Sequence, residues 1–124
     1  MVNKKNEKIL TTHFSNGKVH DFELYKRSQV QFTRNTRIGT DLGYKGIEKI
    51  HPQVSIPKKK SKYHPLTKKE KANNKRIARE RILVEHVIRK VKIFRIVAER
   101  YRNRRKRFAL RMNLITAIYN FELC

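Results

Sequence analysis

Two acidic residues, Asp41 and Glu85, have the type and setting needed to bind a catalytic divalent cation. Asp41 ends a short stretch, residues 37–41, that is expected to be extended, and a glycine-containing turn follows it. A strand end would fix the carboxylate, while the turn would leave room for a substrate. Mg²⁺ prefers oxygen ligands and keeps several waters, so one or two carboxylates with substrate phosphates suffice. Taken alone, an aspartate before Leu-Gly is more often an ordinary turn residue.

Glu85 falls in a segment with a helical pattern, at the edge of its apolar stripe. Arg81 and Arg89 stand four residues to either side, so the simplest interpretation is an ion pair on the helix surface, worth about 0.3–0.5 kcal/mol. The five histidines show no pair at zinc-ligand spacing on one helix, and no Gly-rich phosphate loop or Ser or Cys nucleophile signature is present. The residues alone therefore leave the role of both carboxylates open.

Basic residues dominate the chain. Its 124 residues include 32 Lys and Arg against 10 Asp and Glu, a formal net charge of +22. Solubility of a small domain needs a net charge of only about 2 to 8, so a polyanion partner, most commonly DNA or RNA, accounts better for this excess. A membrane is disfavoured because no window approaches the roughly 18 consecutive apolar residues of a spanning helix. The lone cysteine, Cys124, offers no internal disulfide and favours a reducing, cytoplasmic setting.

The elements that would position these carboxylates are mixed α and β. Short strands are expected at residues 9–14, 37–41 and 53–56, which are rich in β-branched residues or are bounded by turn signals. A short helix is expected over residues 21–27, with Asp21 near its first turn, where a carboxylate suits the positive end of the helix dipole. The organisation predicted for this single domain is a strand-rich part (1–57), a basic loop (58–66) and a helical part (67–121).

Two helices are expected in the C-terminal part. Thr67 and Glu70 have the spacing of a capping box, and the helix that they start should reach about Val97. Its predicted apolar stripe consists of Ile77, Val84, Ile88 and Val91. After a bend, a second helix is expected over residues 103–121, with an apolar face of Phe108, Met112, Ile115 and Ile118 or Tyr119.

The cations gather in a few stretches, which are candidates for contact with nucleic-acid phosphates. Phosphate contacts position a duplex without reading its sequence. Residues 104–107 would fall in the first turn of the second helix, where the dipole disfavours cations, and bound phosphate is one explanation. The candidate DNA-binding residues are Lys58, Lys59, Lys60, Lys62, Arg81, Arg89, Arg102, Arg104, Arg105 and Arg107.

Five motifs, taken together, resemble the IS5-like and Harbinger-like transposases of the DDE (Asp-Asp-Glu) type. Each motif alone is loose, but five in the right order cover nearly the whole chain, which makes the resemblance specific. They are GKVHDFELYKRS (17–28), DLGYKGI (41–47), IPKKKSKYHPLTKKEK (56–71), RILVEHVIRKVKIFRI (81–96) and YRNRRKRFALRMNLITAIYN (101–120).

The resemblance implies an RNase H-like fold, partial in this chain, in which three carboxylates hold two Mg²⁺ or Mn²⁺ ions in the complete enzyme. Asp41 matches the second carboxylate and Glu85 the third, whereas the first would lie on an opening strand upstream of Met1. Asp21, in the His-Asp pair, matches a separate family position and is expected to be structural or to support the metal ligands, with a smaller chance of binding metal itself. The implied activity is DNA transposition through metal-assisted phosphodiester hydrolysis and strand transfer.

The implied partners are transposon-end and target DNA, together with the missing N-terminal half or an intact transposase, and the expected place is the cytoplasm or a bacterial nucleoid. With one carboxylate missing, the isolated chain should bind DNA without cutting it efficiently. Residues 9–14, as a strand without its neighbour, would also favour aggregation. The alternative is a small basic nucleic-acid-binding protein without catalysis, which explains the charge but not the DLGY motif or a glutamate in a helix of arginines.

Overall fold

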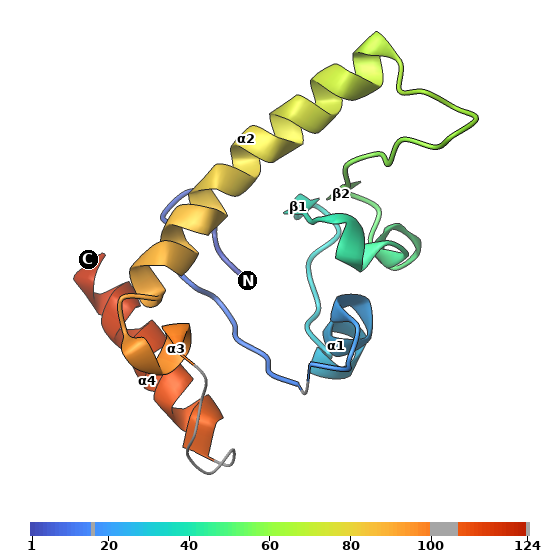
Figure 1. Cartoon of the computed structure of the whole chain (residues 1–124). Helices are drawn as coiled ribbons and strands as arrows, with labels where there is room; N and C mark the ends of the chain where they lie inside the picture. Colours follow the sequence, from blue (N-terminus) through green and yellow to red (C-terminus); the bar gives the residue numbers. More distant parts are fainter. Residues whose placement is uncertain (16, 100–106, 124) are drawn as a thin grey trace. The chain divides into compact units, whose positions relative to one another are not determined.

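The computed structural model describes residues 1–15, 17–99 and 107–123 (Figure 1). It is a mixed α/β structure of helices and one small parallel sheet. The chain divides into two compact units, one made of Met1–Phe14 with Ile82–Cys124 and the other of Ser15–Arg81. Helix α2 (Lys68–Val91) runs through the boundary and contributes to both.

The unit Ser15–Arg81 contains the sheet and most of the short elements. Strands β1 (Ile38–Gly39) and β2 (Val54–Ser55) pair in parallel. The strands predicted at residues 37–41 and 53–56 are therefore confirmed, although each is only two residues long. Prolines flank β2 at positions 52 and 57, and a proline has no backbone N–H to donate to a ladder, which limits its length. The other elements are α1 (Asp21–Ser28) and the 3₁₀ turns η1 (Leu42–Tyr44) and η2 (Ile47–Lys49).

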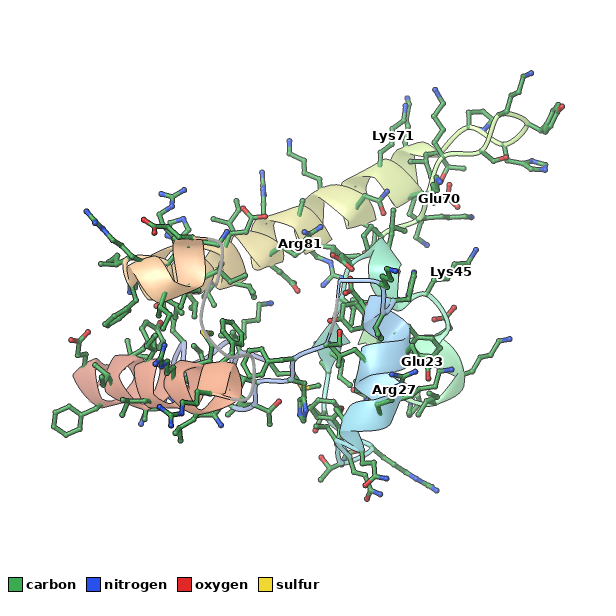
Figure 2. The ribbon with its side chains drawn as sticks, turned by 60° about the horizontal axis from the view of Figure 1, so that its bottom comes forward. Glu23, Arg27, Lys45, Glu70, Lys71 and Arg81 are labelled. Atoms are coloured by element: carbon green, nitrogen blue, oxygen red, sulfur yellow. The ribbon has the colours of Figure 1, made fainter. Side chains whose placement is uncertain are left out.

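Helix α1 forms where the sequence predicted it. The side chain of His20 accepts a hydrogen bond from the backbone N–H of Phe22 and caps the N-terminus. Acidic residues occupy the first turn and basic residues the last, as the helix dipole favours. Glu23 pairs with Lys26 at 3.1 Å and with Arg27 at 3.3 Å, and Figure 2 labels Glu23 and Arg27 on this helix. The order of charges in the sequence thus matches the helix dipole and helps to stabilise α1.

Gly46 connects the turn η1, which follows Asp41, to the turn η2, and it lies close to Phe22 of helix α1. Its φ of 110° belongs to the left-handed region that side chains rarely adopt, and a Cβ there would lie 3.0 Å from Cε1 of Phe22. The residue after it, Ile47, is buried at 1% exposure. Glycine at position 46 therefore allows the Phe22 ring of α1 to lie against this turn.

Replacing Gly46 by alanine should lower the free energy of unfolding by about 1–3 kcal/mol, because the backbone is strained and the Phe22 ring must move. Urea denaturation followed by circular dichroism measures the change. Gly39→Ala is the matched control, because a Cβ at Gly39 would meet nothing within 4 Å and its φ is not positive. Equal stability of the two variants would contradict this description of the turn.

The strand predicted at residues 9–14 is wrong. Only Ile9 takes part in β structure, through an isolated antiparallel bridge to Val2. The segment instead bonds to side chains of helix α4 (Phe108–Glu122): Asn120 accepts from the N–H of Ile9 and donates to its C=O, both at 2.8 Å. Thr12 donates to Asn113 at 2.7 Å. The Asn120 amide thus bonds to the backbone N–H and C=O of Ile9 as a neighbouring strand would, while Asn113 holds the Thr12 side chain.

The core of this unit, Met1–Phe14 with Ile82–Cys124, lies between helices α2 and α4. Its buried residues are Val87, Val91, Ile115 and Tyr119. The apolar stripe predicted for α2 is therefore partly wrong, because Ile88 is 45% exposed whereas Val87 is 1% exposed. Val87 lies three residues after Val84 and four before Val91, a spacing that fits a helix face equally well.

The C-terminal helices are shorter than predicted. α2 ends at Val91, and a short helix α3 (Arg95–Ala98) follows the bend that the sequence predicted. α4 begins at Phe108, so Arg107 precedes it and the placement of residues 104–107 in a first helical turn is wrong for Arg107. Residues 104–106 lie outside the described residues. On α4, Ile115 and Tyr119 are buried as expected, whereas Ile118 is exposed.

Candidate metal and nucleic-acid site

The carboxylates of Asp21 and Asp41 both lie close to Gly43. Asp41 is the N-cap of η1, and its Oδ1 accepts a hydrogen bond of 2.9 Å from the N–H of Gly43. A Cβ on Gly43 would lie 2.8 Å from Oδ2 of Asp21 and 3.1 Å from Oδ1 of Asp41. Oxygens from α1 and from the η1 turn therefore both approach a single point, which is accessible because the residue between them lacks a side chain.

These oxygens suit a hard divalent cation. Mg²⁺ and Mn²⁺ favour carboxylate and water oxygens, and the space left by the missing Cβ of Gly43 lies against both Asp21 and Asp41. In residues 1–15, 17–99 and 107–123, no group of three or more His, Cys, Asp or Glu side chains is close enough to hold an ion. The structure thus brings together two of the candidate ligands.

Arg81 balances the charge of Asp41. Its guanidinium lies 4.0 Å from Oδ2 of Asp41, with side chains 47% and 40% exposed respectively. Figure 2 labels Arg81 on α2. An ion pair this exposed contributes between about 0 and 1 kcal/mol, so other charges can replace the guanidinium at little cost. The pairing also means that Arg81, predicted as a phosphate contact, lies beside a candidate metal ligand.

Tyr44 is a polar neighbour of this site that was not among the residues predicted from the sequence. Burial raises the pKa of its phenol, and the negative charges of Asp21 and Asp41 raise it further. A raised pKa keeps the hydroxyl protonated at neutral pH, as a hydrogen-bond donor near the carboxylates. The only signal for it in the sequence is its place in Asp-Leu-Gly-Tyr, three residues after Asp41.

Glu85 lies on the part of α2 that belongs to the other compact unit. Its side chain is exposed. It forms no ion pair with Arg81 or Arg89, which are both among the described residues, so the surface ion pairs expected from their spacing are not formed. Glu85 is therefore an accessible carboxylate on a helix rich in cations.

The basic loop begins with a lysine that is already paired. Lys58 forms an ion pair with Glu70, and the side chain of Asn74 bonds to both the N–H and the C=O of Lys58, at 2.8 and 2.9 Å. Glu70 also completes the predicted capping box with Thr67, through bonds of 2.9 and 3.2 Å. The Lys58 ammonium and the Thr67 N–H lower the pKa of the Glu70 carboxyl. This end of the loop is thereby fixed to the first turns of α2.

The remaining cations of the loop, Lys59, Lys60 and Lys62, are exposed, as are Arg89 and Arg107. Tyr63 in the same loop is 80% exposed, and the ammonium of Lys62 lies 6.0 Å from the centre of its ring. Three predicted contacts, Arg102, Arg104 and Arg105, lie outside the described residues. No helix in the described part of the chain is long and apolar enough to cross a membrane.

Comparison with known proteins identifies the family of this chain. Residues 1–120 match the DDE superfamily endonuclease family. The chain is also 45% identical, over 123 residues, to a probable transposase for insertion sequence element IS702 from Microchaete diplosiphon. The match includes 99% of this chain but 45% of the relative, so the chain spans about half the length of the curated relative. No solved structure matches. Because the family match covers nearly all of its residues, this chain belongs to the DDE superfamily endonucleases.

Proposed function

We propose that this chain is the part of a DNA transposase that supplies two catalytic carboxylates and much of the contact with DNA phosphates. The observation that supports the role of Asp41 most strongly is that its carboxylate and that of Asp21 both lie against Gly43, whereas Glu85 is proposed from the family resemblance. Family membership gives this pair a chemical purpose that an ordinary turn would not have. The similarity to a probable transposase also supports this proposal.

Asp41 and Glu85 are the proposed catalytic carboxylates and metal ligands, and Asp21 is a further candidate ligand. Bound Mg²⁺ or Mn²⁺, two ions in the complete enzyme, would activate the attacking water or 3′-hydroxyl and stabilise the leaving oxygen. Asp41 is held in position by the N–H of Gly43. The ion pair between Arg81 and Asp41 is weak, so it can break when ligands bind. The Arg81 guanidinium would then bind a DNA phosphate, and the Asp41 carboxylate would bind a cation.

The complete enzyme is proposed to have an RNase H-like fold, of which this chain forms the later part. In that fold, residues 1–57 would supply the short strands and Asp41, residues 58–66 the basic loop, and residues 67–121 the helices with Glu85. The short parallel pair of β1 and β2 is compatible with this assignment, because Asp41 follows β1 by two residues.

Phosphate contacts are proposed for the exposed cations of the loop and helices. Lys59, Lys60 and Lys62 are the strongest candidates, because they are exposed and adjacent, with an aromatic ring beside them. Lys58 contributes less, since Glu70 already neutralises it. Arg89, Arg107 and the arginines at positions 102, 104 and 105 complete the proposed set, and transposon ends and target DNA are the proposed partners.

The isolated chain should bind duplex DNA without cutting it efficiently, because one carboxylate of the proposed three is not among its residues. The test incubates the purified chain with supercoiled plasmid and Mg²⁺ or Mn²⁺, and follows both binding and nicking. Binding without nicking is the expected result. Robust Mg²⁺-dependent nicking by the chain, lost in Glu85→Ala, would overturn the claim that the chain is incomplete, while supporting the role of Glu85.

The second candidate function is nucleic-acid binding without catalysis. The net charge of +22 favours it, because this charge needs a polyanion and no metal. It predicts tight binding to DNA or RNA that is indifferent to Mg²⁺ and to substitution of Asp41. The two proposals therefore differ in the response of the Asp41 variants to divalent cations.

A further inference from the structure

The basic loop, residues 58–66, presents a tyrosine to the solvent. Tyr63 is 80% exposed, and it is the only large hydrophobic side chain of this loop that is exposed. One exposed aromatic residue on a protein surface is common and by itself indicates nothing. The surroundings of Tyr63 are unusual, however, because four lysines lie in the same loop and no acidic residue lies between Glu48 and Glu70.

Both ends of the basic loop are fixed to helix α2. The side chain of Asn74 bonds to the N–H and the C=O of Lys58, and Glu70 pairs with the Lys58 ammonium. At the other end, Thr67 and Glu70 form the capping box that starts α2. Figure 1 shows the loop leaving β2 and returning to α2. Because its ends are already ordered, the loop loses less conformational entropy when it binds a ligand.

Lys62 and Tyr63 are the two central residues of a small turn in the middle of this loop. The N–H of Ser61 donates a hydrogen bond of 3.3 Å to the C=O of His64 and closes the turn. The Lys62 ammonium lies 6.0 Å from the centre of the Tyr63 ring, which is the outer limit of a cation–π contact. So weak a contact lets the lysine turn to a phosphate and leaves the ring face available to a ligand.

A lysine beside an exposed aromatic ring matches the two parts of one nucleotide. The ammonium can contact the phosphate, and the ring can stack on the base whatever its identity, because every base has a π-face. Inside a duplex both faces of a base are covered by its neighbours, so a side chain can stack on a base only after that base has left the helix. We propose that Tyr63 is a stacking site for an unpaired base in distorted DNA, next to the phosphates that the loop lysines bind.

Other ligands fit the basic loop less well. Side chains that wedge between paired bases are typically Phe, Leu, Ile, Met or Pro, and the Tyr63 hydroxyl would lose its water there. Binding to a membrane surface requires buried apolar area as well as charge, and this loop exposes one large hydrophobic residue. DNA is chosen over RNA because the inference rests on the proposed function, contact with DNA phosphates. It does not depend on the metal site.

The test measures, by fluorescence anisotropy, the affinity of the whole chain for three duplexes of one sequence. The first is fully paired, the second has a single extra unpaired nucleotide, and the third has an abasic nucleotide at that position. The abasic duplex keeps the phosphates and the distortion but has no base to stack. The wild-type chain should bind the unpaired base at least about fivefold more tightly than the abasic site, the lower end of what stacking of one base contributes.

Tyr63→Ala should abolish this preference, whereas Tyr63→Phe should keep it, because stacking needs the ring and not the hydroxyl. Phe121→Ala is the matched control, because Phe121 is 81% exposed but stands next to Glu122 instead of lysines. Lys59→Gln should weaken binding to all three duplexes by the same factor, since a phosphate contact does not depend on the base. As a second readout, 5-iododeoxyuridine at the unpaired position should crosslink to Tyr63 under ultraviolet light, which mass spectrometry can locate.

The proposal is overturned if the wild-type chain binds the unpaired base and the abasic site equally, or if Tyr63→Ala keeps the preference. If Tyr63→Ala weakens binding to the paired duplex as much as to the unpaired base, the ring is a wedge between paired bases instead. A preference seen with the same unpaired base in RNA, but not in DNA, contradicts the assignment to DNA. Failure of the proposed function looks different, since the wild-type chain would then bind none of the three duplexes.

Discussion

Replacing Asp41 by alanine should lower DNA-end cleavage by on the order of 10³-fold or more, measured in a transposase that joins this chain to the uncovered part of its relative. A bound divalent cation contributes several kcal/mol of transition-state stabilisation, and each 1.36 kcal/mol corresponds to about a tenfold change in rate. The Asp41 carboxylate is held in position by the hydrogen bond that it accepts from the N–H of Gly43, in the turn that follows it. Its loss should therefore remove catalysis rather than DNA binding.

Single-turnover cleavage of a labelled transposon end, with saturating enzyme, measures this effect. Glu48→Ala is the matched control, because Glu48 is an exposed acid of the neighbouring η2 turn that bonds only locally, to the N–H of Gly46. Glu85→Ala should lower the rate of DNA-end cleavage as much as Asp41→Ala does. If Asp41→Ala and Glu85→Ala both cleave at the wild-type rate, neither residue is a catalytic carboxylate.

Duplex affinity of the isolated chain should fall by about 10³ to 10⁵ between 50 and 200 mM salt, which is the range for a protein making roughly 6–10 phosphate contacts. The exposed lysines and arginines of the basic loop and helices provide enough cations for this number. Fluorescence anisotropy with duplexes of unrelated sequence gives the slope. The slope should be the same for all of them, because phosphate contacts do not read sequence.

The position of the contacts is tested by two double variants of equal charge. Lys59→Gln with Lys60→Gln should reduce the salt slope by about 2 units, since each contact contributes about 0.9. Lys45→Gln with Lys49→Gln removes the same charge from exposed positions that are not proposed contacts. If the two pairs have equal effects, net charge rather than the basic loop determines binding.

Local features of this structure were predictable from the sequence. The capping box of Thr67 and Glu70 and the helix at residues 21–27 formed as expected, because each depends on residues within one or two turns. Turn and proline signals likewise located the two short strands. The apolar stripe of α2 was less certain, since Val87 and Ile88 both fit helical spacing and only packing against α4 selects Val87.

Long-range partners were not predictable. Residues 9–14 have strand propensity, but the backbone of Ile9 bonds to the side chain of Asn120, more than a hundred positions away in the sequence. The meeting of Asp21 with Asp41 depends in the same way on how α1 packs against the η1 turn. The sequence indicated both residues through the family resemblance, whereas their shared contact with Gly43 and the nearby Tyr44 required the structure.

Binding of Mn²⁺ to the chain, followed by electron paramagnetic resonance, tests most directly whether the Asp41 turn is a metal site. The wild-type chain should bind the ion, and Asp41→Asn, which keeps the shape but removes the charge, should weaken binding by at least tenfold. Gly43→Ala should weaken it too, because its Cβ would fill the space between the two carboxylates. Glu23→Gln, an exposed acid of α1, should have no effect, and duplex affinity should stay nearly unchanged in all three variants. Equal Mn²⁺ affinity in the wild type, Asp41→Asn and Gly43→Ala would contradict the account.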